Sequence, residues 1–284
     1  MKSVVVTGAS TGIGWGCVKI LAGRGFHVFG SVRKQADADR LTREFGASFT
    51  PLLFDVTDEA AVAAGAKVVA GRLRSETLAG LVNNAGIAVS GPLLHLDVAE
   101  FRQQLEVNLT GQLIVTQAFA PLLGAAPGAN ANSPGRIVMM SSVGGKNAFP
   151  FVGPYATSKF GLEGFSEALR RELMIYGVDV IVIAPGAVAT PIWDKGDAVD
   201  ISRYANTPFI KPLERVKTYM LQLGRSGFPP EKIGEAVHTA LTAANPKTRY
   251  VVTPRPFENW MTTHLPRRSV DRTVAGRLGL TRSR

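Results

Sequence analysis

The sequence predicts an α/β fold in a single domain, with a doubly wound, central parallel sheet and helices on both of its faces. Apolar runs such as VVV, GRIVMM and VDVIVIAP alternate with amphipathic stretches, as expected of strands that are buried on both faces. A β-branched run at residues 3–6 leads into the glycine-rich TGASTGIG, and a helix-like stretch follows. The length of 284 residues is enough for one well-filled domain.

The N-terminal strand, glycine turn and helix form the first unit of a Rossmann-type nucleotide-binding sheet. Gly8, Gly12 and Gly14 let the backbone turn tightly and approach a pyrophosphate without a Cβ in the way. The helix that follows presents free N–H groups and a positive dipole end to the phosphates. The spacing G-x-x-x-G-x-G differs from the usual G-x-G-x-x-G, so the place of the turn after the first strand carries this prediction.

The end of the second predicted strand, residues 27–33, bears on the choice between NAD and NADP. No carboxylate stands there: Arg33 and Lys34 follow Val32, and the first acid is Asp37 in the next loop. An arginine can donate two parallel charge-assisted hydrogen bonds to a 2′-phosphate. We therefore expect NADP(H) as the preferred cofactor and NAD(H) as the alternative; in the simpler interpretation Arg33 belongs to a solvated basic turn.

Ser142, Tyr155 and Lys159 are the candidate catalytic residues. Tyr155 and Lys159 are four residues apart on an expected helix and so project from one face. A neighbouring cation lowers the pKa of a phenol from about 10, which makes tyrosine a usable proton donor and acceptor. Y-x-x-x-K alone occurs by chance on many helices, but the upstream glycine turn favours the catalytic interpretation.

With these motifs in this order, the chain resembles the short-chain dehydrogenase/reductase family over residues 1 to about 255, closest to its steroid and retinol dehydrogenase branch. TGASTGIG is similar to the family's cofactor turn, and NNAG at 83–86 to the motif that steadies the sheet beside the adenosine ribose. PGAVATP at 185–191 is similar to the loop after the sixth strand. Many NADP-dependent members carry a basic residue before the second motif glycine, whereas this chain has Thr11.

The resemblance implies roles for further residues. Asn108 would be the fourth catalytic residue, Asp55 would contact adenine, and Thr190 would contact the nicotinamide carboxamide. The implied cofactor contacts are Gly8, Ser10, Thr11, Gly12, Ile13, Gly14, Arg33, Asp55, Val56, Asn83, Ala85, Gly86, Tyr155, Lys159, Pro185, Gly186, Val188 and Thr190.

The expected reaction is reversible hydride transfer between nicotinamide and the carbon of a carbonyl or secondary alcohol, with the hydride chemistry supplied by the cofactor. Ser142 would bond the substrate oxygen, and Tyr155 would donate its proton in reduction or accept one in oxidation. Lys159 would lower the pKa of Tyr155 and hold the nicotinamide ribose, and Asn108 would anchor a water that leads to Lys159.

The substrate pocket is expected in the loops at the carboxyl ends of the strands. The segment from about 190 to 228 is rich in aromatic and apolar residues, which favours a lipophilic ketone or alcohol, steroid- or retinoid-like. Candidate pocket residues are Gly144, Phe149, Val152 and Trp193. Two alternatives stay open: a 3-oxoacyl-thioester reductase that serves an acyl-carrier protein, and a non-catalytic NADP(H)-sensing protein, against which the complete Ser/Tyr/Lys/Asn set argues.

We expect a catalytic domain over residues 1–255, with its substrate loop at about 190–228, and a basic extension over 256–284. The net charge is +10, and the stretch from Arg255 to Arg284 holds seven arginines and two acids. No groove-reading element or zinc-ligand spacing accompanies them, so no nucleic acid is expected. Apolar residues among the arginines predict contact with an anionic membrane surface or with the substrate mouth; the simpler interpretation is a solubilising tail.

Targeting and metal signals are not found. No stretch is long enough to span a membrane, and no positive-then-apolar leader precedes the first strand. Cys17 is the single cysteine, and the histidines have no spacing typical of a metal site. We therefore expect a cytoplasmic protein that holds no metal and acts on a small molecule. The resemblance implies a homodimer or homotetramer.

Overall fold

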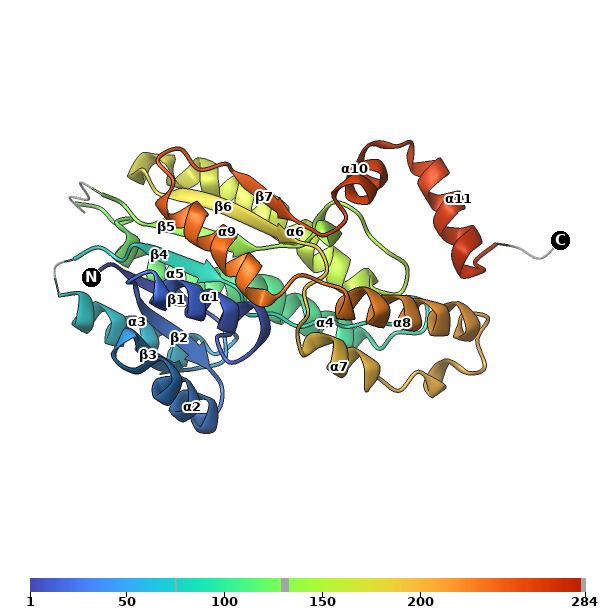
Figure 1. The fold of residues 1–284 in the computed structure, drawn as a ribbon, viewed down its shortest axis with the longest axis horizontal. Coiled ribbons are helices and arrows are strands. Elements are labelled where there is room, and N and C mark those ends of the chain that lie inside the picture. Colours follow the sequence, from blue (N-terminus) through green and yellow to red (C-terminus); the bar gives the residue numbers. More distant parts are fainter. Residues whose placement is uncertain (75, 129–132, 282–284) are drawn as a thin grey trace.

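The computed structural model describes residues 1–74, 76–128 and 133–281, which form seven parallel strands with helices on both faces (Figure 1). The strand order β3-β2-β1-β4-β5-β6-β7 confirms the doubly wound fold in a single domain. It reverses direction between β1 and β4, and in such sheets the ligand crevice opens at the carboxyl ends of the strands on either side of this point. The strands are β1 Ser3–Val6, β2 His27–Val32, β3 Phe49–Leu53, β4 Gly80–Asn83, β5 Arg136–Met140, β6 Asp179–Pro185 and β7 Arg249–Val252.

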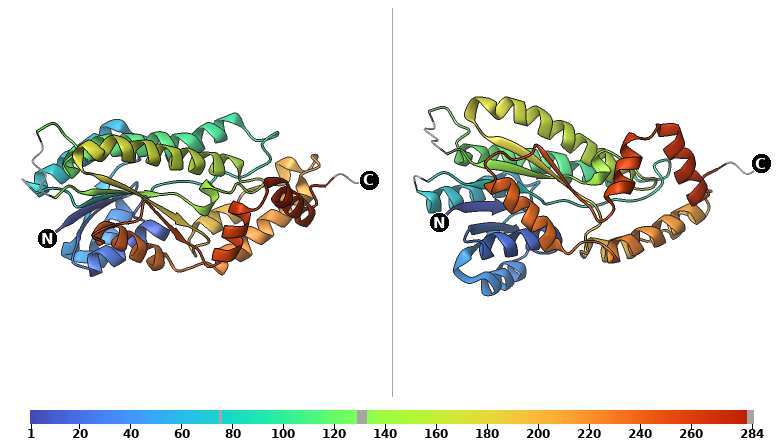
Figure 2. Two further views of the ribbon diagram at one scale, coloured as in Figure 1. Left: turned by 90° about the horizontal axis from the view of Figure 1, so that it is seen from above. Right: turned by 45° about the horizontal axis from the view of Figure 1, so that its top comes forward.

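Two helical layers enclose the sheet, as the view from above shows (Figure 2). One face is covered by α1 Gly12–Gly23, α2 Gln35–Phe45 and α9 Pro230–Thr242. The other is covered by α3 Glu59–Leu73, α5 Gly111–Phe119 and α6 Gly153–Glu172. The helix α4 Val98–Leu105 runs into α5 through a π-helical turn, η2 Glu106–Thr110.

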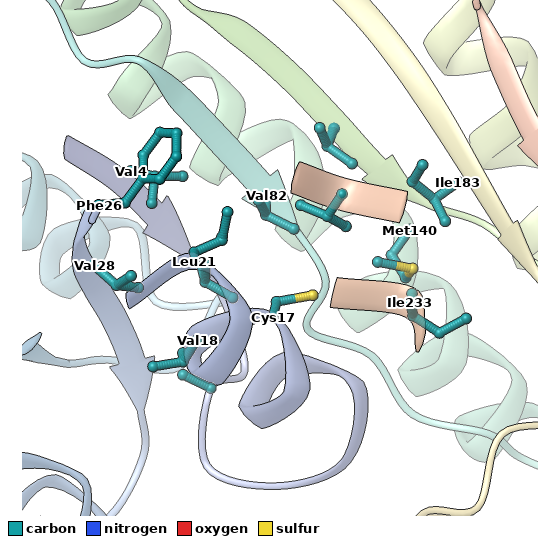
Figure 3. Close-up of a cluster of buried hydrophobic side chains, with 14 of the residues drawn as sticks. Val4, Cys17, Val18, Leu21, Phe26, Val28, Val82, Met140, Ile183 and Ile233 are labelled. Atoms are coloured by element: carbon teal, nitrogen blue, oxygen red, sulfur yellow. The ribbon is translucent and has the colours of Figure 1, made fainter. Parts of the chain in front are cut away.

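Alternation along the strands divides the core into two clusters. Successive side chains of a strand point to opposite faces, so Val4 packs on the face covered by α1 and Val5 on the face covered by α5. Figure 3 shows the first cluster, in which Cys17 and Leu21 of α1 lie near Ile233 of α9. Burial raises the pKa of the Cys17 thiol to about 12, which keeps it protonated and leaves it a packing role.

The remaining helices lie beyond the carboxyl end of the sheet: α7 Ile192–Asp197, α8 Ile210–Arg225, α10 Pro256–His264 and α11 Arg267–Leu278 (Figure 1). The C-terminal segment packs on this region, since Leu278 is only 6% exposed. Its partners in a third apolar cluster are Phe151, Tyr204, Leu213 and Val216. Within the described ranges, none of the helices has both the length and the apolar character needed to traverse a bilayer.

Candidate active site

The glycine turn between β1 and α1 is built so that no side chain fills it. Gly8 and Gly12 have φ angles of 65° and 58°, in the left-handed region that favours glycine. A Cβ on Gly14 would lie 2.1 Å from the Gly8 carbonyl oxygen. The turn and the free N–H groups at the start of α1 therefore fit a pyrophosphate.

Segments distant in the sequence close around this turn. A Cβ on Gly8 would lie 3.0 Å from the Cα of Ala85, and one on Gly12 would lie 3.2 Å from the Cβ of Thr190. Gly86 follows Ala85 and lies next to Asn108, since its Cβ would be 3.1 Å from the Asn108 Oδ1. The loops after β4 and β6 thus meet the turn, as the predicted cofactor contacts require.

The two asparagines of NNAG have different partners. The amide of Asn83 is buried away from the turn and donates to the Thr116 hydroxyl of α5 at 2.8 Å. Asn84 instead donates to the Thr7 and Gly8 carbonyl oxygens at 2.8 and 3.3 Å. Sequence reasoning selected Asn83 and missed Asn84; the signal was its position just past the end of the strand.

Arg33 and Asp55 lie together at the ends of β2 and β3. The Arg33 guanidinium is 3.5 Å from the Asp55 carboxylate and 66% exposed, so it is free to turn toward a ligand. Burial works to raise the pKa of Asp55, but hydrogen bonds from Thr57 and the charge of Arg33 hold it below its usual range. Val56, which follows, is buried against α5, where a Cβ on Gly111 would meet it at 2.8 Å.

Arg40 is a second cation at this site, and sequence reasoning missed it. It lies on α2 and donates a 2.6 Å hydrogen bond to the Ser10 carbonyl oxygen of the glycine turn. It also donates to Asp37 at 3.3 Å, three residues earlier on the helix. The sequence signal that could have revealed Arg40 was its spacing of three residues from Asp37, which is typical of a helix. Asp37 had been assigned to a loop, so this spacing was not used.

Ser142 and Tyr155 meet at the carboxyl end of β5. Helix α6 begins at Gly153 with Pro154 in its first turn, where a proline is well tolerated, and this places Tyr155 near its start. The Ser142 hydroxyl accepts from the Gly144 N–H at 3.0 Å and lies 3.5 Å from the Pro185 carbonyl oxygen. Burial raises the pKa of Tyr155, and a hydrogen bond with Ser142 works in the opposite direction.

Lys159 lies one helical turn beyond Tyr155 and is buried. Its Nζ donates to the Met140 carbonyl oxygen at 2.7 Å and is 5.7 Å from the centre of the Tyr155 ring. Burial lowers the pKa of Lys159 to about 8, against the charge of Glu163, which raises it. The net pKa of Tyr155 is raised, because burial of the phenol outweighs the hydrogen bond with Ser142 that lowers it; that Lys159 lowers the Tyr155 pKa stays a prediction.

Asn108 supports helix α6 from the π-helical turn. Its Oδ1 accepts from the Ile87 N–H at 2.9 Å, and its Nδ2 donates to the Ile87 carbonyl oxygen at 3.0 Å and to Ser158 at 3.1 Å. Ser158 in turn donates to the Tyr155 carbonyl oxygen at 2.7 Å. The Asn108 side chain thus ties the loop after β4 to α6, and the water that we expected it to anchor stays a prediction.

Gln104 holds the same loop as Asn108, and sequence reasoning missed it. It is fully buried, accepts from the Val89 N–H at 2.7 Å and donates to the Ile87 carbonyl oxygen at 3.0 Å. Gln104 and Asn108 are four residues apart and so share one helical face, which was the signal in the sequence.

The four predicted pocket residues lie in different settings. Gly144 is at the catalytic groups, since a Cβ there would be 3.3 Å from the Ser142 Oγ and 3.5 Å from the Tyr155 ring. The Phe149 ring stacks on Tyr219 of α8 at 5.8 Å. Val152 directly precedes α6, and the Trp193 indole donates to the Val188 carbonyl oxygen at 2.7 Å.

An apolar cavity of about 230 Å³ opens at the amino end of α6. The lining residue Leu93 places the cavity at this end of α6, because a Cβ on Gly153 would lie 2.9 Å from the Leu93 side chain. Another hollow lies at the amino ends of β1 and β2, beside Ser3 and His27, at the opposite end of the sheet from the catalytic groups. The lining residues of the apolar cavity are Pro92, Leu93, Leu94, Pro150, Phe151, Phe209 and Leu280.

Phe151 is the lining residue with the most constrained backbone. Its φ of 65° is rare for a bulky residue. Its carbonyl oxygen accepts from the Gly91 N–H at 2.7 Å, which joins the two loops, and its ring meets Phe209 edge to face at 6.0 Å.

No group of three or more His, Cys, Asp or Glu side chains is placed to hold a metal ion in the described part of the chain. The site instead gathers a phenol, a hydroxyl and an ammonium beside a turn shaped for phosphates. These groups can transfer a proton to or from an oxygen next to a bound dinucleotide.

Comparison with known proteins identifies the family. Residues 2–199 match the family described as short chain dehydrogenase. The chain belongs to the short-chain dehydrogenase/reductases. This short-chain dehydrogenase/reductase is 39% identical over 256 residues to an NADPH-dependent 3-dehydrocapnine reductase from Ornithobacterium rhinotracheale, an alignment that covers 90% of this chain and 89% of that protein.

Other relatives of this short-chain dehydrogenase/reductase agree with the steroid and retinol branch. Human retinol dehydrogenase 5 is 32% identical over 264 residues, which cover 87% of this chain and 79% of that protein. A solved short-chain dehydrogenase/reductase from Burkholderia phymatum, in complex with NAD, superposes with a TM-score of 0.78 at 22% identity, covering 96% and 95% of the two chains, and supports the fold. The chain is therefore an NAD(P)-dependent oxidoreductase, as predicted, and the non-catalytic alternative is not supported.

Proposed function

We propose that this enzyme uses NADPH to reduce a lipophilic ketone, reversibly, to the secondary alcohol. The apolar cavity beside the helix that carries Tyr155 is the observation that supports this substrate class. The lining residues named above are all apolar, so the hydroxyls of a sugar would lose their water there without gaining hydrogen-bond partners. We assign catalysis to residues 1–255, with Leu280 of the extension 256–284 among the residues that line the cavity.

The catalytic roles follow from the groups at the carboxyl end of β5. The bound cofactor supplies the hydride chemistry. We assign Ser142 to hold the substrate oxygen and Tyr155 to donate a proton to it. Lys159 supplies the positive charge beside the ribose, and Asn108 holds the loop and helix in register.

The preference for NADPH is supported by two cations. Arg33 is exposed at the end of β2, and Arg40 contacts the glycine turn. Either guanidinium can form paired hydrogen bonds with a 2′-phosphate. The 3-dehydrocapnine reductase that is 39% identical is named for its dependence on NADPH, which supports the same assignment here.

Fluorescence titration with NADPH and NADH, followed by a carbonyl panel, tests the proposal. The panel compares bulky apolar ketones with small ones and with acetoacetyl thioesters. We expect tighter binding of NADPH and faster turnover of the bulky ketones. Preference for the thioesters would replace the proposal with the 3-oxoacyl-thioester reductase, for which the net charge of +10 suits an acidic carrier protein.

A variant of Phe151 ties the panel to the cavity. Phe151→Ala removes an aromatic wall and should lower kcat/KM for bulky apolar ketones about tenfold or more, because burial of apolar area drives their binding. Small ketones serve as the internal control and should lose much less. Equal losses for both groups of ketones would show that the cavity does not hold the substrate.

We also propose that the enzyme forms a homodimer or homotetramer through α5 and α6. Leu113 and Phe160 on these helices expose their apolar side chains, as do Met174 and Ile175 just after α6. Burial of this surface between subunits would remove an exposed apolar patch. Phe160→Arg should reduce the mass measured by light scattering; a monomeric parent protein would refute the assignment.

Peripheral contact with a membrane is proposed for α10. Phe257 and Trp260 are 68% and 54% exposed, their rings stack at 6.4 Å, and Arg255, Arg267 and Arg268 lie nearby in the sequence. Aromatic rings with arginines suit an anionic lipid surface. The double change Phe257→Ser and Trp260→Ser should abolish co-sedimentation with vesicles that contain phosphatidylserine, and unchanged sedimentation would remove this proposal. We place the protein in the cytoplasm, which cell fractionation can check.

A further inference from the structure

A buried carboxylate lies directly behind the catalytic groups. Glu163 is on α6, four residues after Lys159, and is only 9% exposed. Its Oε1 accepts a hydrogen bond from the Ser141 hydroxyl at 2.7 Å. Its two oxygens accept from Arg249 Nε at 3.1 and 3.0 Å. A charge in such a place is destabilising unless it is paired and hydrogen-bonded, and both conditions are met here.

Ser141 connects this carboxylate to the catalytic groups. It lies between Met140, whose carbonyl oxygen holds the Lys159 ammonium at 2.7 Å, and Ser142, which hydrogen-bonds Tyr155. The Ser141 N–H also donates to the Ile183 carbonyl oxygen at 2.8 Å. A side chain that holds Ser141 therefore fixes the segment on which both contacts depend.

The following turn leaves room for this contact by means of a glycine. A Cβ on Gly145 would lie 2.7 Å from the Ser141 Oγ and 3.0 Å from the Glu163 Cγ. Only a residue without a side chain lets Glu163 approach Ser141 here without displacement of the turn.

The charges around Lys159 come from several elements. On α6 itself, Glu163 favours the ammonium form of Lys159, which burial disfavours. From β7, Arg249 partly offsets the charge of Glu163. The uncharged polar groups near them are the Met140 carbonyl of β5, the Pro185 carbonyl of β6, and the amides of Gln104 and Asn108, which reach α6 through Ser158.

We propose that Glu163 is a positioning residue for the oxidoreduction: its carboxylate keeps Lys159 in the ammonium form and, through Ser141, fixes the turn that carries Ser142. This role rests on the proposed function, in which Tyr155 and Lys159 carry out the proton chemistry. Glu163 contacts Ser141 and Arg249 and acts through its neighbours.

Glu163→Gln tests the proposal, because it removes the charge and keeps the volume and one oxygen for Ser141. The readout is the Lys159 pKa, which is measured by NMR titration of protein whose lysines carry ¹³C at Cε. The spectrum of Lys159→Arg identifies the Lys159 signal. We expect the Lys159 pKa to fall by about one unit, which corresponds to a tenfold loss of the ammonium preference. The half-maximal pH of alcohol oxidation should rise, because a neutral Lys159 no longer favours the Tyr155 phenolate.

Matched variants separate this role from plain packing. Glu167→Gln is four residues further along α6, exposed and paired with Arg171, and should shift neither value. Glu163→Asp keeps the charge and should restore the Lys159 pKa. If the role of Glu163 were only structural, Glu163→Gln would lower the melting temperature and reduce activity by the same factor at every pH. An unchanged Lys159 pKa in Glu163→Gln would overturn the proposal.

Removal of both charges guards against misfolding. If Glu163→Gln alone does not fold, the double change Glu163→Gln and Arg249→Gln also removes the guanidinium that would lose its partner. It should lower the Lys159 pKa in the same direction but by less, because Arg249 partly offsets Glu163. An unchanged value there would equally refute the role. The NMR titration needs no substrate, so it can fail or succeed independently of the activity of Tyr155→Phe, which tests the proposed function.

Discussion

The Lys159 ammonium donates a 2.7 Å hydrogen bond to the Met140 carbonyl oxygen and lies 5.7 Å from the centre of the Tyr155 ring. Burial raises the pKa of Tyr155 and lowers that of Lys159 to about 8. At neutral pH, both groups therefore carry their protons. This state suits Tyr155 as a proton donor, which is the role that reduction of a carbonyl requires.

Tyr155→Phe should lower turnover at least about a hundredfold, because it removes the transferable proton and keeps the bulk of the ring. Cofactor affinity, measured by fluorescence titration, should be largely retained. Tyr176→Phe, in the short helical turn Leu173–Tyr176 that directly follows α6, is the matched control and should behave like the parent. Near-normal turnover of Tyr155→Phe would refute the catalytic assignment.

The stability of the protein should depend on the titration of Lys159. The unfolded chain holds this proton up to the ordinary pKa of 10.5, whereas the folded chain holds it up to about 8. Between these values the unfolded state binds more protons, so the Lys159 contribution to the free energy of unfolding rises with pH. Urea unfolding of the parent and of Lys159→Met should diverge above pH 8, in favour of the parent. Parallel pH curves would contradict the buried position of Lys159.

Gly14→Ala should disrupt the glycine turn, because the added Cβ would lie 2.1 Å from the Gly8 carbonyl oxygen. We expect loss of NADPH binding and a lower melting temperature. Gly23→Ala is the control on the same helix, where a Cβ would meet no atom within 4 Å. It should be neutral or stabilise the protein by up to about 1 kcal/mol, since alanine is the better helix former. Similar unfolding of the two variants would argue against the tight turn.

Arg33→Ala should weaken NADPH binding about tenfold and leave NADH binding unchanged, because the lost contact is with the 2′-phosphate. Lys34→Ala, the neighbouring exposed cation, should change either affinity much less. Equal effects on both cofactors would mean that Arg33 acts elsewhere. If Arg33→Ala still prefers NADPH, we would assign the remaining preference to Arg40. The double variant Arg33→Ala and Arg40→Ala can confirm this.

Much of the site could be predicted from local patterns. Gly8, Gly12 and Gly14 form a tight turn because backbone sterics require glycine there, wherever the rest of the chain lies. Tyr155 and Lys159 share a face because helical geometry fixes positions four residues apart. Both relations span a few residues, so they can be predicted before any tertiary contact is known.

Contacts across long sequence separations could not be predicted in this way. Arg40 reaches the Ser10 carbonyl oxygen, and Arg249 reaches Glu163, only because the sheet brings their elements together. The direction of the Tyr155 pKa also escaped prediction, since it depends on burial and not on sequence spacing.

The sequence by itself determined the parallel α/β fold, the tight glycine turn and the shared helical face of the candidate catalytic residues, because periodicity, glycine sterics and helical spacing act locally. The tertiary structure alone decided which of two adjacent asparagines faces the turn, which loops wall the apolar cavity, and which carboxylate stands behind Lys159. These depend on the packing of segments far apart in the chain, where the orientation of a side chain is set by its neighbours and not by its own sequence.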